Sequence, residues 1–402
     1  MNRETFKKEA ACMENPKWAA CIAREEPIYQ RPYEIRSEFW RDYNRLLHSK
    51  AYRRLKHKTQ VFHAAGNDHI CTRIEHVNHV CAVSYTICSY LGLNTELALA
   101  IGIGHDIGHA PFGHDGEHIL NKLCRQYACG HFYHEGNGLF FADRIELLQN
   151  QKGDYSHLNL TYAVRDGIVC HCGEVDQNSI FPREDVVPLS GIDKANALAP
   201  FTWEACVVKV SDKISYLGRD LEDAVRLKLL EPSQLEELMM IERRHWGNNM
   251  PGSTNTALIH SFVIDLCQHS TPAEGICFSR PCFETISRIK EFNYKYIYSH
   301  QRLKYYSAFA EVVINNIFDV CFRTYDRDRA KLLQNIGRQQ EVFPKLMQSF
   351  LQWLRQYADI GDGANAVFRL DTEEQFARNI VLFISSMSDT FALEMFNELT
   401  TF

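Results

Sequence analysis

The apolar residues of the chain recur at helical spacing over most of its length. In segment 37–57 the aromatic and leucine residues fall near one face and the basic residues on the other, which predicts an amphipathic helix capped by Ser37. Segment 95–105 differs, because after Asn94 it is nearly all small and apolar. That composition predicts a buried helix that ends at His105.

Further helices are expected through the rest of the chain, and strand signals are scarce. The expected ranges are 73–91, 115–128, 136–150, 159–171, 203–229, 232–244, 255–269, 281–299, 302–322, 328–338, 342–357 and 372–399. At most one short hairpin is expected. Stretches 176–201 and 247–256 are rich in Pro, Gly, Asn and Ser, and we interpret them as loops or insertions. The pattern predicts an all-α chain, with 247–256 separating a helical core from a C-terminal helical part.

The composition is that of an ordinary globular protein. Of 402 residues, 45% are hydrophobic and 23% are charged, which excludes wholesale disorder. No apolar stretch reaches the roughly 18 to 20 uncharged residues of a membrane span, and the N-terminus lacks the apolar core of a signal peptide. We therefore expect a cytoplasmic protein whose 14 cysteines are reduced thiols.

The cysteines do not indicate a metal or redox site. The chain contains no Cys-x-x-Cys pair, so a zinc ribbon or a thioredoxin-type site has no support. The closest pairing is Cys170-His171-Cys172, with no second pair at ligand spacing. We interpret this triplet as buried small residues around one polar side chain.

Charge is distributed unevenly along the chain. The net charge of −6 does not indicate a surface that coats nucleic acid. Between Arg31 and Lys58, however, nine Lys and Arg residues stand against three acids. This segment is either a solvated helix face or a source of positive potential beside a site in the N-terminal third.

Histidines cluster with acids in the same region. Of 18 histidines, 12 lie between His48 and His134, which favours a metal or acid-base site. His105 and Asp106 offer a nitrogen and a carboxylate from adjacent residues at a helix end, a pairing that suits divalent cations. A catalytic metal needs further ligands, and His76 and Asp212 in flanking helices meet that need.

Six collinear stretches resemble one family of HD-domain phosphohydrolases. They are SKAYRRLKHKTQVF (49–62), TRIEH (72–76), HDIGHAPFGHDGE (105–117), HEGNG (134–138), SDKISYLGRDLEDA (211–224) and MSDTFALEMFNEL (387–399). The family is that of the deoxynucleoside triphosphate triphosphohydrolases, or dGTPase-like enzymes, and the resemblance covers about 36–399. It implies a basic N-terminal helical arm (1–60), an HD-type core (61–246) and a C-terminal helical region (257–402) packed on the core.

The resemblance implies a metal-dependent reaction. Water attacks the α-phosphorus of a deoxynucleoside triphosphate, and a deoxynucleoside and inorganic triphosphate are released. The implied cofactor is a divalent cation, Mn²⁺ or Mg²⁺ first, with Fe, Co, Ni or Zn as alternatives. The implied metal ligands are His76, His105, Asp106 and Asp212.

The remaining site residues follow from the same resemblance. His114 is implied as the acid-base group, oriented by Glu117, with His134 as a third catalytic residue. The implied substrate-binding residues are Arg53, Lys58, Gln60, Arg73, His109, Lys213, Tyr216 and Asp220. Asp212, Tyr216 and Asp220 are spaced i, i+4, i+8 and so share one helix face. A homo-oligomer and a dNTP effector are also implied.

The sequence departs from the family pattern around the first ligand. The family usually has Thr-His-Ser/Thr-x-Glu-Val, whereas this chain has Glu75 before His76 and His79 in place of the glutamate. These changes bear on the tuning of the metal ligands.

Three alternatives stay open from the residues alone. A nucleotide phosphomonoesterase or phosphodiesterase would use the same HD ligands, and a nucleotide sensor would bind without turnover. His114-Asp-Gly-Glu117-His118 also fits the His-x-x-Glu-His pattern of inverted zinc peptidases, although Gly116 weakens the helix that this pattern requires.

Overall fold

The computed structural model describes residues 3–28, 33–63, 67, 69–149, 153, 155–172, 177–246, 255–360 and 366–401. Most of these residues are helical, which confirms the predicted all-α class. The one sheet among them pairs two short antiparallel strands, β1 (Leu147–Gln149) and β2 (Tyr155–His157). Among the described helices, none combines the length and the apolar character needed to cross a membrane.

The first half of the described chain forms the helices that surround the candidate site. They are α1 (Trp18–Cys21), α2 (Glu38–His48), α3 (Lys50–Arg54), the 3-10 turn η1 (Leu55–His57), α4 (Arg73–Leu91), α5 (Thr95–Gly104), α6 (Gly113–Gln126), α7 (His134–Phe140), the π turn η2 (Phe141–Ile145), α8 (Tyr162–Cys170), the 3-10 turn η3 (Leu189–Gly191) and α9 (Trp203–Arg226).

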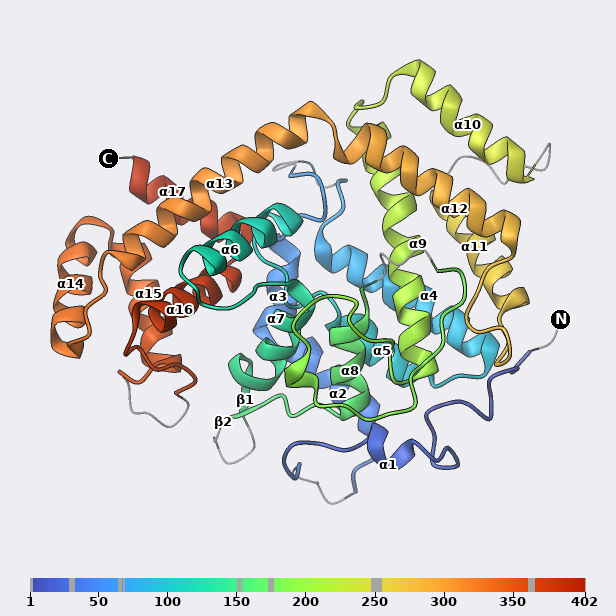
Figure 1. The fold of residues 1–402 in the computed structure, drawn as a ribbon, viewed down its shortest axis with the longest axis horizontal. Coiled ribbons are helices and arrows are strands. Elements are labelled where there is room, and N and C mark those ends of the chain that lie inside the picture. The colour runs from blue at the N-terminus through green and yellow to red at the C-terminus, as the bar shows by residue number, and fades with distance from the viewer. Residues whose placement is uncertain are drawn as a thin grey trace.

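Helix α5 is buried among its neighbours, as its apolar sequence predicts. The Asn94 side chain caps it by accepting hydrogen bonds from the backbone nitrogens of Glu96 and Leu97. The helix packs against α2, α4, α8 and α9. The residues that follow its last turn therefore lie in the interior of the molecule (Figure 1).

Helix α9 is the longest of the site helices, with 24 residues. The Thr202 side chain caps its start by accepting from the backbone nitrogen of Ala205. It packs against α4, α5, α8 and α11. Helix α9 thus lies beside α4 and α5, although it is far from both in the sequence.

The second half of the chain adds helices at both ends of the molecule. They are α10 (Pro232–Trp246), α11 (Asn255–His269), α12 (Arg280–Phe292), the π turn η5 (Asn293–Tyr298), α13 (Gln301–Phe322), α14 (Arg329–Val342), α15 (Pro344–Tyr357), α16 (Glu373–Ser385) and α17 (Asp389–Thr400). Figure 1 shows α10–α12 at one end, α14–α17 at the other and α13 running between them. Helices α13 and α16 both pack against α6. Of the predicted boundary 247–256, residues 247–254 lie outside the described residues.

Three predicted helices are interrupted in the structure. Segment 37–57 breaks at Ser49 and segment 372–399 at Ser388, and each serine caps the next helix by accepting a backbone N–H. Serine hydroxyls compete with helical hydrogen bonds in this way, which explains both breaks. The predicted helix 136–150 gives way to β1 after Ile145.

Candidate active site

The segment between α5 and α6 carries the histidine-aspartate pair and packs tightly on α7. His105 and Asp106 follow the last turn of α5 and are 0% and 3% exposed. A Cβ added at Gly108 would lie 2.1 Å from the backbone nitrogen of Gly138 and 2.1 Å from the backbone oxygen of His134. Only glycine fits this close approach, and it brings α7 against the pair.

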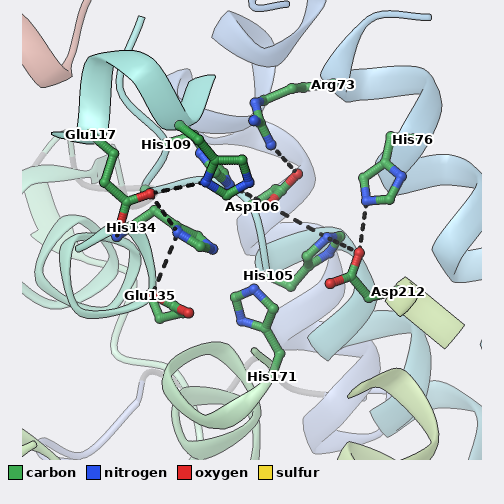
Figure 2. A network of polar contacts seen from close by, with 12 residues as sticks. Arg73, His76, His105, Asp106, His109, Glu117, His134, Glu135, His171 and Asp212 are labelled. Carbon is green, nitrogen blue, oxygen red and sulfur yellow. Dashed lines mark hydrogen bonds and ion pairs between the residues drawn. The ribbon is translucent and has the colours of Figure 1, made fainter. Parts of the chain in front are cut away.

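Four side chains meet here: His76 from α4, Asp212 from α9, and the His105–Asp106 pair that follows α5 (Figure 2). One donor atom from each of His76, His105 and Asp212 lies within 4.8 Å of the other two. Nε2 of His76 is 2.9 Å from Oδ1 of Asp212, and Nε2 of His105 is 3.8 Å from that oxygen. Oδ1 of Asp106 is 3.6 Å from Nε2 of His105. The structure therefore brings the four predicted metal ligands together.

The donor set fits a divalent cation. Nδ1 of His105 lies 2.7 Å from the backbone oxygen of Gly102, which can only accept, so Nδ1 carries the proton and Nε2 holds the lone pair. That Nε2 is buried and has no hydrogen-bond partner among the described residues. A bound cation would satisfy it. Two imidazoles and two carboxylates suit the divalent cations that the sequence predicts.

Asp212 and His76 shift each other's pKa. Burial alone would raise the pKa of Asp212, but the hydrogen bond with His76 and the nearby imidazole of His105 outweigh burial and lower the pKa to about 2. Burial alone would lower the pKa of His76, and the same contact with Asp212 raises it instead. Asp212 is thus a carboxylate at neutral pH, the form that binds a cation.

Asp106 is held in place from two sides. Arg73 donates from Nη1 to Oδ2 of Asp106 at 2.9 Å, and Nε2 of His109 lies 3.0 Å from Oδ1. Burial opposes the ionised form, but the neighbouring imidazoles of His105 and His109 and the guanidinium of Arg73 lower the pKa of Asp106 well below its usual range. Arg73 is itself 1% exposed, so it orients this carboxylate from within the protein.

A second cluster beside the first contains the three predicted catalytic residues. Oε2 of Glu117 is 3.3 Å from Nδ1 of His114 and 3.1 Å from Nδ1 of His134. The rings of His109 and His134 stack with their centroids 3.8 Å apart, which joins the clusters. Burial alone would lower the pKa of His134, but the charges of Glu135 and Glu117 outweigh it and raise the pKa to about 10. The His114 side chain is 68% exposed and so accessible from solvent.

His171 belongs to the site, and our interpretation of the Cys-His-Cys triplet missed it. Its ring packs edge-on against His105 at 5.0 Å and against His134 at 5.4 Å between centroids. One donor atom from each of Asp106, His134 and His171 lies within 4.8 Å of the other two. The only signal in the sequence is a histidine directly after the apolar segment that forms α8. Because His171 lies far along the chain from the other histidines of the site, the sequence gives no sign that it is close to them in space.

The predicted substrate-binding face of α9 is reinforced by a residue that was not predicted. The hydroxyl of Tyr298, in η5, donates to Oδ2 of Asp220 at 2.6 Å. Burial raises the pKa of Asp220 to about 7. Tyr216 on the same face is half-buried. Nζ of Lys213 lies 5.6 Å from the centroid of the Phe283 ring, a cation–π distance.

The predicted binding residues of the N-terminal arm differ in their surroundings. Arg53 is exposed on α3, and no hydrogen bond or ion pair of the described residues links its guanidinium to the site. Lys58 is 2% exposed, and its Nζ donates to the backbone oxygens of His109 and Ser385. A phosphate contact by Lys58 would replace these bonds. Oε1 of Gln60 is buried and without a hydrogen-bond partner among the described residues.

The two unusual residues around His76 have structural partners. Oε2 of Glu75 accepts from the backbone nitrogen of Thr72 at 2.8 Å and so caps α4. His79 is half-buried, and burial together with the charge of Arg219 lowers its pKa to about 4. Glu75 and His79 lie outside the metal-capable groups found among the described residues.

The peptidase alternative finds no support in this geometry. His118 is exposed and lies outside the metal-capable groups of the described chain. Glu117 instead contacts His114 and His134.

Comparisons with known proteins identify the family to which the chain is similar. A model of the HD domain family matches residues 73–217, which contain all four clustered ligands. A deoxyguanosinetriphosphate triphosphohydrolase-like protein of Caldanaerobacter subterraneus subsp. tengcongensis is 32% identical over 80% of this chain and 82% of its own length. Proteins with the same description from Cereibacter sphaeroides and Rickettsia rickettsii are 30% and 29% identical, over 93% and 92% of this chain and 97% and 92% of their own lengths.

Proposed function

The chain belongs to the family of deoxyguanosinetriphosphate triphosphohydrolase-like proteins with an HD domain, and from that premise we propose that it converts a deoxynucleoside triphosphate to the deoxynucleoside and inorganic triphosphate. In the proposed reaction water attacks the α-phosphorus and the bond to the 5′-oxygen breaks. Such a reaction needs a cation at the phosphate, a proton for the leaving oxygen and groups that hold the triphosphate.

The observation that carries the proposal is the adjacency of two clusters with different chemistry. His76, His105, Asp106 and the partly buried Asp212 supply donors for a divalent cation. The Glu117 cluster next to them supplies histidines whose protons are controlled by carboxylates. The proposed hydrolysis would use both, and the stacked rings of His109 and His134 keep the clusters in contact.

The metal ligands and Arg73 have distinct roles in this proposal. When bound, the cation would polarise the α-phosphate and lower the pKa of a water molecule. Asp106 keeps its charge and orientation because Arg73 and His109 hold its two oxygens. The contact between Arg73 and Asp106 also keeps a positive charge next to the place where phosphate charge develops.

His114 is the proposed acid for the leaving 5′-oxygen. An alkoxide is a poor leaving group, so it must receive a proton as the bond breaks. Glu117 engages Nδ1 of His114 at 3.3 Å, which leaves Nε2 as the atom that transfers the proton. His114 is the most accessible histidine of its cluster, with a side chain 68% exposed, whereas His134 is 10% exposed. His134 is therefore proposed to support Glu117 from the buried side.

The substrate is proposed to lie along α9. Lys213 follows the ligand Asp212 directly and is the proposed partner of the phosphate charge. Gln60 offers a buried amide oxygen without a partner among the described residues, which suits a hydrogen bond to the sugar. Tyr216 and Asp220 share the helix face beyond Lys213, where a deoxyribose would pack against Tyr216 and its 3′-hydroxyl would bind Asp220.

Product analysis tests the proposal. The protein is incubated with each of the four dNTPs and Mn²⁺ or Mg²⁺, and the products are separated. We expect equimolar deoxynucleoside and inorganic triphosphate, and no turnover by Asp212→Ala, which should also lose metal. Monophosphate with pyrophosphate, or no turnover with either metal, would disprove the proposal, and activity retained by Asp212→Ala would remove that residue from the ligand set.

A further inference from the structure

We propose that Cys124 and Cys129 form a reversible disulfide when the protein reacts with hydrogen peroxide. The pair lies where α6 ends, at the opposite end of that helix from His114 and Glu117. Four residues separate the two cysteines, so they match no Cys-x-x-Cys pattern, and the sequence alone did not indicate a redox site. The inference does not depend on the proposed function, because it uses none of the predicted site residues.

A Schellman motif at the end of α6 brings the two cysteines together. The backbone nitrogen of Cys129 donates to the backbone oxygen of Cys124 at 2.9 Å, and the backbone nitrogen of Ala128 donates to that of Arg125 at 3.3 Å. Ala128 takes the left-handed conformation that this motif requires, with φ of 51°. The side chains at the two ends of such a motif frequently pack against each other, and here both are thiols. A disulfide needs Cα atoms about 4.4–6.8 Å apart, and residues joined across one closed turn meet that requirement.

The sulfur of Cys124 has two partners that favour its thiolate form. Nη1 of Arg378, on α16, lies 3.6 Å from Sγ of Cys124 and also donates to the backbone oxygen of His131 at 2.9 Å. The Cys129 thiol donates a hydrogen bond to the same sulfur. This hydrogen bond and the charge of Arg378 outweigh burial and lower the pKa of Cys124. By contrast, burial raises the pKa of Cys81 to about 12. The thiolate is the form that reacts with oxidants, so the chain has a reactive cysteine at this turn.

Solvent reaches the pair from the side of Cys129. Cys124 is fully buried, whereas Cys129 is half-buried and lies between the exposed residues Ala128 and Gly130. A small oxidant can therefore approach the two sulfurs through this surface turn. Oxidation-sensitive cysteines are typically thiolates that solvent can reach and that have a second cysteine beside them, and this pair meets each condition.

The proposed oxidation consumes one hydrogen peroxide and releases two waters. The thiolate sulfur attacks one oxygen of the peroxide, the O–O bond breaks, and the departing hydroxide takes up a proton to give water and a sulfenic acid. The sulfur of the other cysteine then attacks the sulfenic sulfur, and the S–S bond forms. The hydroxyl group leaves with the proton of the second thiol as another water. The two cysteines together lose two electrons and two protons, which the peroxide accepts.

Peptide mass spectrometry on the full chain tests the disulfide. The reduced protein is treated with one equivalent of hydrogen peroxide, the remaining thiols are blocked with N-ethylmaleimide, and the protein is digested with trypsin without reduction. Cleavage after Lys122, Arg125 and Arg144 places the two cysteines in different peptides, 123–125 and 126–144. We expect these two peptides to be joined, two hydrogen atoms lighter than the separate pair, and to come apart with dithiothreitol. Two of the 14 cysteines should escape the maleimide.

Variants and a gel complete the test. Cys124→Ser and Cys129→Ser should each lack the joined peptides, whereas Cys12→Ser, which changes another half-buried cysteine, is the matched control and should form them as the unchanged protein does. The proposal is overturned by separate peptides in the oxidised unchanged protein, or by a joined product that dithiothreitol does not open. A linkage only between two chains, which a non-reducing gel shows as a dimer, also overturns it. These results come from the unchanged protein and need no variant to fold.

Discussion

Asp220→Asn should change how the stability of the protein depends on pH. Burial raises the pKa of Asp220 from 3.8 to about 7, even though Tyr298 donates a hydrogen bond to the carboxylate. Because the pKa is raised in the folded state, the contribution of Asp220 to the free energy of unfolding is complete below about pH 3.8 and is lost as the pH rises through about 7. This interval spans about three pH units at about 1.4 kcal/mol each, so the loss is up to about 4 kcal/mol.

Asparagine has nearly the same shape as aspartate and does not titrate. The free energy of unfolding of Asp220→Asn minus that of the unchanged protein should therefore increase by up to about 4 kcal/mol between about pH 4 and 7, then level off. Urea denaturation of both proteins over this range measures the difference, in which the other titrating groups cancel. Tyr298→Phe keeps the carboxyl group but removes a hydrogen bond that lowers its pKa, so the loss of stability with rising pH should persist and extend to higher pH. A difference that does not vary with pH would refute the reasoning.

Three further predictions concern the metal cluster and its neighbours. Glu117→Gln should lower kcat about 10²–10⁴-fold with KM little changed, because the amide no longer fixes the proton of His114. Steady-state kinetics measures both constants. An unchanged kcat would contradict the role of Glu117 in orienting His114. Gly108→Ala should lower the free energy of unfolding by at least about 1–3 kcal/mol and reduce the bound metal, because the added Cβ would lie 2.1 Å from the backbone of α7. Denaturation and metal analysis measure both effects. A variant that is stable and binds the full amount of metal would argue against the close packing. Chelation of the metal should lower Tm, because a cation at about one hundred times its Kd stabilises the folded protein by about 2.7 kcal/mol. Calorimetry with and without chelator measures the difference. An equal Tm would mean that the metal does not bind the folded state.

Local signals in the sequence were enough to place the helices that carry the metal cluster. The predicted segment 73–91 coincides with α4, which starts at the capping pair Thr72 and Glu75 and ends at Gly92, a left-handed residue with φ of 81°. The buried helix before His105 was also predicted, because caps and apolar composition are local properties. These features determine helix existence and length without any knowledge of the partner helices.

Contacts between distant segments were beyond the reach of local patterns. Tyr298 reaches Asp220 from a π turn 78 residues away. Asp389, at the start of α17, accepts from the backbone nitrogens of Thr59 and Phe112 and so ties the C-terminal region to the site. His171 joins the cluster only because α8 packs against α5, α7 and α9. Such pairings depend on tertiary packing, which one sequence does not encode in its spacing.

The most direct test of the central claim is a single reaction in ¹⁸O-labelled water with a dNTP and Mn²⁺, followed by mass spectrometry of the separated products. Attack of water at the α-phosphorus predicts one ¹⁸O atom in the released triphosphate and an unlabelled deoxynucleoside. The label in the 5′-hydroxyl of the nucleoside, or in a nucleoside monophosphate, would contradict the account.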